Sequence, residues 1–212
     1  MIIQDSRWED LDLTPEETGV YAWYLNPVLR PADLADSQST KENLLRLAEQ
    51  LRLPSFDVKA RGHLSLTFEG NLDHMHLASE NKKELSELVE SVLESTAKRE
   101  VFANILGSAV PHLMAPLYIG VATNIRERLR QHRSQIEDYR ELLRSGYHET
   151  MLEDERQKFA LEVVRRGIPS RYLRIFVSIV SQRYSNMEEN RKIAEAVETI
   201  LNRLFYPIMG RR

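Results

Sequence analysis

The segment Pro116–His132, which reads PLYIGVATNIRERLRQH, places an arginine and a histidine one helical turn apart. It predicts a strand over Leu117–Ala122 and then a helix that Asn124 can cap and that ends near residue 145. Four apolar residues at helical spacing define the buried face of that helix: Ile125, Leu129, Ile136 and Leu143. His132 falls at the centre of this face and Arg128 at its edge, so both side chains are expected to point toward a sheet.

A buried arginine–histidine pair has two readings. Desolvating these groups is costly without partners, so they belong either to a site that binds an anion and moves protons or to a structural ion pair with a satisfied core histidine. The pattern alone gives these readings equal weight. Free amides where the helix starts, at Asn124, also suit a phosphate oxygen, although an ordinary strand-to-helix turn is the favoured reading there.

The elements that must position this pair come from distant parts of the chain. Apolar alternation predicts strands at Gly19–Leu25 and Tyr172–Val180, and helical periodicity predicts helices at about 151–166 and 187–205. Between the first two strands the pattern predicts a helix after the Ser39-Thr40-Lys41-Glu42 capping box, a hairpin over Phe56–Gly70, a helix over about 81–106, and a linker over Gly107–Pro116. The order indicates an α/β (α+β) fold with a small sheet.

Composition excludes several classes of protein. The 212 residues are 42% hydrophobic and 29% charged, which is typical of a folded domain, and no cysteine is present for disulfides, thiol catalysis or cysteine-held metals. No secretory signal and no run of roughly 20 apolar residues occurs, so we expect a soluble, cytoplasmic protein without a membrane partner. The net charge is −5 over residues 1–21 but +4 over 117–183, so a polyanion can approach the C-terminal half.

Five pieces of this chain resemble the GIY-YIG nuclease superfamily. Gly19-Val20-Tyr21 and Tyr118-Ile119-Gly120 match its two signatures, and Arg128 and His132 lie ten and fourteen residues after Tyr118, as in the family. A glutamate on the last helix followed nine residues later by proline corresponds to Glu198 and Pro207. Glu198 flanks the apolar face formed by Ile193, Val197, Ile200, Leu201 and Leu204, whereas Glu195 points away.

The resemblance implies a single domain over 1–212. Its core, at 15–25 and 116–212, would be a mainly antiparallel three-stranded sheet flanked by helices, and 26–115 would be an inserted accessory segment. Family members usually have only some ten to twenty residues between the signatures, so this insertion is a departure. A second departure is Gly210, which stands where many members carry a supporting asparagine.

The implied activity is metal-dependent endonucleolytic hydrolysis of phosphodiester bonds, above all in DNA. Glu198 would hold Mg²⁺ or Mn²⁺, and Arg128 would stabilise charge on the scissile phosphate. Tyr21 would be the general base, as a phenolate whose pKa the cationic site lowers, with Tyr118 and His132 in support. Beside them, Arg126, Arg130 and Arg133 on the helix flank are the expected nucleic-acid contacts.

The alternative is a nuclease-derived module without turnover that serves as a nucleic-acid or protein adaptor. The complete catalytic set favours the enzyme, whereas Gly210 and the near-neutral charge favour the module. The amphipathic Leu85–Ile105 stripe of the insertion either packs internally, which is favoured, or binds a protein partner or a second copy. The remaining histidines match no strong metal motif, and His74-Met75-His76 is expected to lie in a loop.

Overall fold

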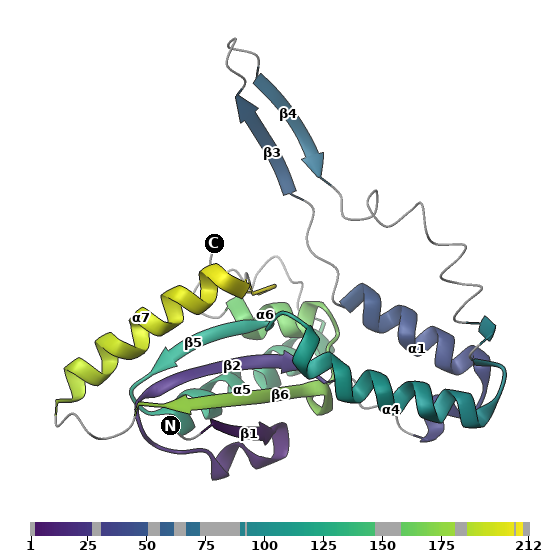
Figure 1. The fold of residues 1–212 in the computed structure, drawn as a ribbon, viewed down its shortest axis with the longest axis horizontal. Helices are drawn as coiled ribbons and strands as arrows, with labels where there is room; N and C mark the ends of the chain where they lie inside the picture. Colours follow the sequence, from purple (N-terminus) through teal and green to yellow (C-terminus); the bar gives the residue numbers. More distant parts are fainter. Residues whose placement is uncertain are drawn as a thin grey trace. The chain divides into compact units, whose positions relative to one another are not determined.

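The computed structural model describes residues 3–26, 31–50, 56–61, 67–72, 90–91, 93–146, 158–180, 186–205 and 207–209. The chain forms two compact units. The larger combines residues 1–28 with 106–212, and the smaller comprises 29–105. The larger unit contains the main sheet and every residue of the expected catalytic set, so the two are considered separately (Figure 1).

A four-stranded antiparallel sheet is the centre of the larger unit. Its strands, in spatial order, are β1 (Ile3–Arg7), β6 (Leu173–Ile179), β2 (Gly19–Leu25) and β5 (Tyr118–Ala122). The three predicted strands do share one sheet, but the prediction of a three-stranded sheet was wrong because β1 adds an edge strand. That strand reads IQDSR, with a single strongly apolar residue, and so carries little alternation to mark it.

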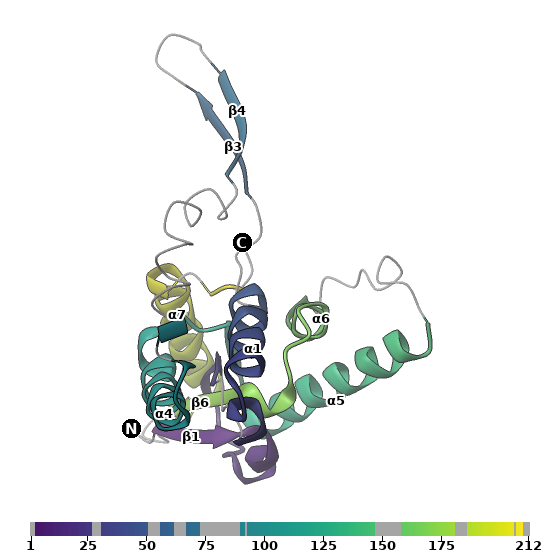
Figure 2. The ribbon, with the colours of Figure 1, turned by 90° about the vertical axis from the view of Figure 1, so that its right-hand side faces the viewer.

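Successive residues of β2 and β5 point to opposite faces of the sheet, so each strand contributes side chains to the packing on both faces. Val20 and Ile119 pack against Ala194 on one face. Tyr21 and Tyr118 point to the other face, toward the helix that carries His132. Figure 2 shows this layering, with α7 (Met187–Phe205) on one side of the sheet and α5 (Ile125–Arg144) and α6 (Lys158–Arg165) on the other.

Helix α5 has the predicted start and the predicted buried face. Asn124 accepts a hydrogen bond from the amide of Glu127 at 3.0 Å and so caps the helix. Its buried residues are Ile125, Leu129, His132, Ile136 and Tyr139, whereas Leu143, which was also predicted to be buried, is half-buried. Two short 3₁₀ helices, η1 (Trp8–Leu13) and η5 (Ser170–Tyr172), lead out of β1 and into β6.

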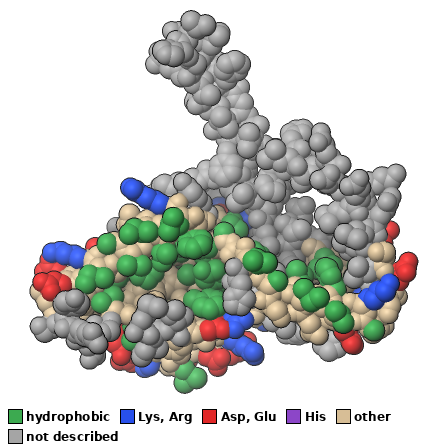
Figure 3. Space-filling model, in the orientation of Figure 1, with side chains coloured by type: hydrophobic (Ala, Val, Ile, Leu, Met, Phe, Trp, Pro, Cys, Tyr) green, Lys and Arg blue, Asp and Glu red, His purple; other side chains and the backbone are tan. Residues whose placement is uncertain are grey.

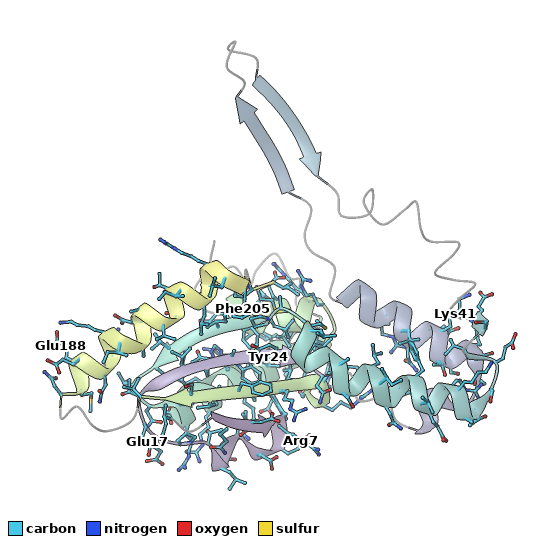
Figure 4. The ribbon with its side chains drawn as sticks, viewed as in Figure 1. Arg7, Glu17, Tyr24, Lys41, Glu188 and Phe205 are labelled. Carbon is cyan, nitrogen blue, oxygen red and sulfur yellow. The ribbon has the colours of Figure 1, made fainter. Side chains whose placement is uncertain are left out.

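Helix α7 differs from expectation in the face that it buries. Ala194 is fully buried and Leu201 packs beside it, as predicted for Leu201. The other four residues of the predicted face are exposed: Ile193, Val197, Ile200 and Leu204. Hydrophobic side chains accordingly gather on the surface over α7 and the neighbouring strands (Figure 3). Tyr24 lies on this same side of the sheet, and Glu188 and Phe205 mark the two ends of the helix (Figure 4). The sheet therefore covers only part of the apolar face of α7, and the rest of that face is exposed.

The smaller unit holds η2 (Pro31–Leu34), α1 (Ser37–Gln50), the hairpin of β3 (Phe56–Arg61) and β4 (Thr67–Leu72), and the first part of α4 (Thr96–Leu113). The predicted hairpin is confirmed. The N-terminus of α1 is capped by Asp36, whose carboxylate accepts from the Ser39 amide at 2.8 Å, so the predicted capping box was placed too late. Buried Arg99 donates to the carbonyls of Leu34 and Leu93.

The prediction of a linker over Gly107–Pro116 was wrong, because α4 continues to Leu113. Pro111 lies in its last turn and cannot donate to the Gly107 carbonyl. With its amide turned to satisfy both neighbours, Asn26 donates to that carbonyl at 3.3 Å and accepts from Arg174. The side chain of Asn26, which directly follows β2, thus replaces the missing helical hydrogen bond. Within the described residues, no helix is long and apolar enough to cross a membrane.

Candidate active site

A buried hydrogen bond joins the first signature to α5. The Tyr21 hydroxyl lies 2.9 Å from Nε2 of His132, and the ring tautomer decides which of the two donates. Tyr21 is 1% and His132 3% exposed. The face assigned to His132 from sequence is therefore confirmed, and the histidine meets a partner 111 positions away.

Tyr118 completes a cluster of rings around this bond. Its ring centroid lies 6.1 Å from that of Tyr21 and 5.7 Å from that of His132. Gly120 makes this approach possible, because a Cβ atom there would lie 2.7 Å from both the Tyr118 ring and the Tyr21 hydroxyl. The glycine of the second signature thus leaves room for both tyrosines.

The glycine of the first signature has a different reason. A Cβ at Gly19 would lie 2.3 Å from the Ser178 carbonyl oxygen of β6 and 2.9 Å from the Ile125 side chain. Only a residue without a side chain lets β2 pair with β6 while the start of α5 packs over it. The two glycines therefore set the positions of the strand and the helix that carry Tyr21 and His132.

Phe159 and Trp23, which the sequence pattern did not assign to the site, pack against its rings. Phe159 of α6 lies within ring contact of Trp23, Tyr118 and His132, with centroids 5.1 to 5.3 Å away. Trp23 is fully buried. Phe159 falls within the predicted helix at 151–166, but nothing in a helical pattern identifies which strand it will meet. The side chains around Tyr21 and His132 are therefore largely apolar, and this environment disfavours charge on either group.

Burial controls the protonation of this pair. Desolvation, helped by the positive charge of Arg128, lowers the pKa of His132 to about 3, so the imidazole is neutral near pH 7. Desolvation, followed by the nearby Tyr118, raises the pKa of Tyr21 above its usual value, although Arg128 opposes the rise. The expectation of a Tyr21 phenolate is therefore wrong for this state, because burial outweighs the cationic neighbour.

Arg128 connects the buried pair with the surface. It is half-buried at the edge of the buried face of α5, as predicted, and its positive charge is close enough to Tyr21 to oppose the rise in the pKa of that hydroxyl. Its Nη1 donates to Gln131 at 3.1 Å. Arg128 also lines a pocket of about 260 Å³ at the junction of β5, α5 and α7. One guanidinium thus faces both the tyrosine hydroxyl and a space open to solvent.

The amides at the start of α5 are occupied. The Ile125 and Arg126 amides donate to the carbonyls of Glu17 and Pro15, and Asn124 accepts from the third. The favoured reading of an ordinary turn is therefore confirmed. An anion at this site would depend on side chains.

The three flanking arginines are ion-paired with the N-terminal segment. Arg126 bonds to Glu16 at 2.5 Å, and Arg130 and Arg133 both reach Asp12, at 2.6 and 3.2 Å. These contacts fasten α5 to the segment between β1 and β2. A carboxylate therefore already lies beside each of these three arginines.

Glu198 is half-buried on α7, one turn after the buried Ala194 and before Leu201. It therefore lies toward the sheet-facing side rather than outside it. After the helix, the amides of Ile208 and Met209 donate to the carbonyls of Pro116 and Leu117, which ties the Pro207 turn to the start of β5. The helix that carries Glu198 is thus anchored beside the second signature.

One carboxylate is a sufficient protein ligand for magnesium, which keeps several waters and takes one or two carboxylates. Among the described residues, no group of three or more histidine or acidic side chains could form a closed cage. The described residues therefore do not form a site built from protein ligands alone, and a hydrated magnesium or manganese ion would need Glu198 as its carboxylate.

Several sequence expectations lie outside the described residues. Gly210, His63, His74, His76 and His148 are among them, and of His112 only the backbone, in α4, is described. Of the predicted Leu85–Ile105 stripe, only 85–89 and 92 lie there too. In the described part Leu93 is buried, but Val101 and Ile105 are exposed, and the predicted helix over about 81–106 is interrupted by a turn at 94–95 before α4 begins at Thr96.

Comparison of the chain with family models, with curated proteins and with solved structures finds no match. The assignment below depends on the residues and their geometry.

Proposed function

We propose that this protein is a metal-dependent endonuclease of GIY-YIG type that hydrolyses phosphodiester bonds, above all in DNA. The observation that carries the proposal is the convergence of Tyr21, Tyr118, Arg128 and His132 on one cluster, although they come from two strands and a helix far apart in the chain. Packing alone does not require these residue types beside a pocket lined by a guanidinium.

Each residue has a role that its position supports. Arg128, which faces the pocket, binds the scissile phosphate and offsets the negative charge that develops as the phosphorus–oxygen bond breaks. Glu198 lies on α7, which covers the other face of the sheet, and does not line the pocket; a magnesium ion that it held would supply Lewis-acid chemistry from that side. Tyr118 packs against Tyr21 and restricts its ring.

The Tyr21–His132 pair handles the proton. Because burial makes the phenol a weak acid, Tyr21 can take a proton from the attacking water only as its own proton passes to Nε2 of His132. This transfer requires the tautomer in which Nε2 is unprotonated. The low pKa of His132 makes it a weak proton acceptor, in part because the positive charge of Arg128 disfavours the imidazolium. The transfer therefore depends on a phosphate binding to Arg128 and offsetting that charge.

A second function, a nucleic-acid-binding module without turnover, is favoured by one observation. Tyr21 is 1% exposed, and its hydroxyl is bonded to a neutral histidine rather than presented to solvent. A binding module needs Arg128 at the pocket but not an accessible Tyr21.

Plasmid cleavage separates the two. Supercoiled DNA is incubated with the protein in magnesium and in EDTA, beside Arg128→Gln and, as a control with the same loss of charge on α5, Arg144→Gln. The enzyme proposal expects nicking with magnesium by the wild type and by Arg144→Gln but not by Arg128→Gln. Retarded, uncut DNA under every condition would support the binding module instead.

A further inference from the structure

A second arginine faces the pocket that Arg128 lines. The pocket is formed by the end of β5, the first turns of α5, and Arg191 from α7. Arg128 comes from α5 and Arg191 from α7, and these two helices cover opposite faces of the sheet (Figure 2). One carboxylate, Glu127, also lines the pocket, so the lining carries a net positive charge.

The size of the pocket limits its ligand. About 260 Å³ is below the roughly 300–1,000 Å³ of sites that enclose a drug-sized molecule. A phosphate with part of its sugar fits this space, whereas a whole cofactor does not. Two guanidiniums from separate helices suit the oxygens of an anionic backbone, since the planar arginine fork matches phosphate geometry.

Arg191 already holds a replaceable anion. Its Nε donates to Glu195, one turn along α7, at 2.8 Å, and the two side chains are 60% and 44% exposed. An exposed pair at this spacing is worth little, so a phosphate can displace the carboxylate. Glu195, which the helical pattern turned away from the site, thus occupies the arginine when no ligand is bound.

We propose that Arg191 is a nucleic-acid-binding residue that contacts a backbone phosphate next to the one at Arg128, in exchange for its ion pair with Glu195. The inference rests on the proposed function only in taking the ligand to be a nucleic acid. Arg191 acts in binding and does not touch the reacting atoms.

The chain provides a matched control on the same helix. Lys192 follows Arg191 directly, is 69% exposed, and forms its own ion pair across one turn, with Glu188, also at 2.8 Å. Lys192 does not line the pocket. Arg191→Gln and Lys192→Gln therefore each remove one positive charge and one exposed ion pair from α7. The difference tested is that Arg191 lines the pocket and Lys192 does not.

The experiment is equilibrium binding of a fluorescent mixed-sequence DNA duplex, in EDTA to prevent cleavage, at several salt concentrations. Arg191→Gln should weaken binding about five- to tenfold and reduce the slope of log affinity against log salt by about 1, as expected for one lost phosphate contact. Lys192→Gln should leave the slope unchanged. Glu195→Gln should tighten binding, and Glu188→Gln should do so less.

Equal effects of Arg191→Gln and Lys192→Gln would overturn the inference, since general charge would explain both. Because both residues are exposed on the helix, circular dichroism should show unchanged melting temperatures. Wild-type protein that binds DNA with the Arg191 effect but never cleaves would defeat the nuclease proposal and support this one. Cleavage by wild type with no Arg191 effect would do the reverse, and absence of DNA binding by wild type would defeat both.

Discussion

The Tyr21 hydroxyl and Nε2 of His132 lie 2.9 Å apart in a part of the molecule that solvent scarcely reaches. Neither group is charged near pH 7, since burial disfavours both the phenolate and the imidazolium. The bond therefore contributes to folding as well as to the proposed chemistry, and the two contributions can be measured separately.

Tyr21→Phe removes one oxygen and leaves the ring in place. The His132 nitrogen then loses its partner inside the core, which should reduce the free energy of unfolding by about 1–3 kcal/mol. The rate of the proposed phosphodiester cleavage should fall at least a hundredfold, because phenylalanine cannot pass a proton from the attacking water to His132. Urea denaturation and plasmid nicking measure the two effects.

Tyr24→Phe is the control for that substitution. It makes the same chemical change three residues along β2, on the face toward α7, where Tyr24 is half-buried. Its activity should match the wild type. Equal losses of activity in both variants would show that the Tyr21 hydroxyl has no special part in the reaction.

The pH dependence of stability should report His132. Its pKa is about 3 in the folded protein, below the usual value of 6.5, so the unfolded chain binds one more proton between these limits. Stability is therefore complete above pH 6.5 and falls as the pH decreases toward 3, by up to about 1.4 kcal/mol per pH unit from this group. The slope between pH 6.5 and 5 gives the effect most directly.

His132→Gln isolates that slope, because glutamine keeps a polar group beside Tyr21 and does not titrate. All other titrating groups are shared, so the difference between the two proteins belongs to His132. Parallel stability curves for wild type and variant from pH 7 to 5 would show that His132 is charged or exposed in the folded state.

Gly120→Ala should disturb the site more than its single methyl group suggests. The new Cβ would lie 2.7 Å from both the Tyr118 ring and the Tyr21 hydroxyl, so at least one ring must move. We expect a loss of about 1–3 kcal/mol in unfolding free energy together with loss of cleavage. Gly146→Ala has open space around it and should cost only the strain of its positive φ. A Gly120→Ala protein with wild-type stability and activity would contradict the described packing.

The sequence predicted the parts of this fold that depend on strong local patterns. The α5 face with His132 at its centre followed from helical periodicity, and the meeting of Tyr21 with Tyr118 followed from the paired signatures. β1 was missed because an edge strand of IQDSR has almost no apolar alternation. The ion pairs of Arg130 and Arg133 with Asp12 were also missed, since no local pattern joins residues more than 100 positions apart.

Periodicity also could not say how much of an apolar arc a neighbour covers. In α7 the sheet side holds Ala194 and one residue of the predicted arc, Leu201, whereas the rest of the arc, around Ile200, is exposed. The pKa of Tyr21 was predicted in the wrong direction for a related reason. Charge near a group can be inferred from sequence, but the depth of its burial, which here has the larger effect, depends on the finished packing.

Glu198→Gln tests the metal site. Glutamine has nearly the same volume but lacks the charge that a hydrated magnesium ion requires, so the variant should fold, with a change in unfolding free energy within about 1 kcal/mol. Without the ion, charge on the scissile phosphate loses several kcal/mol of stabilisation, which corresponds to at least a hundredfold to thousandfold decrease in cleavage rate. Glu188→Gln makes the same change at an exposed position of α7 and should leave the rate unchanged.

Cleavage is measured against magnesium concentration for all three proteins, with calorimetric titration of magnesium as a second readout. The cleavage rates of the wild type and of Glu188→Gln should saturate at the same magnesium concentration. Glu198→Gln should release no heat of magnesium binding, and its cleavage rate should show the decrease given above at every magnesium concentration. Cleavage by Glu198→Gln with the wild-type magnesium dependence would mean that the ion is held elsewhere, and Arg128 with the Tyr21–His132 pair would then have to act without this carboxylate.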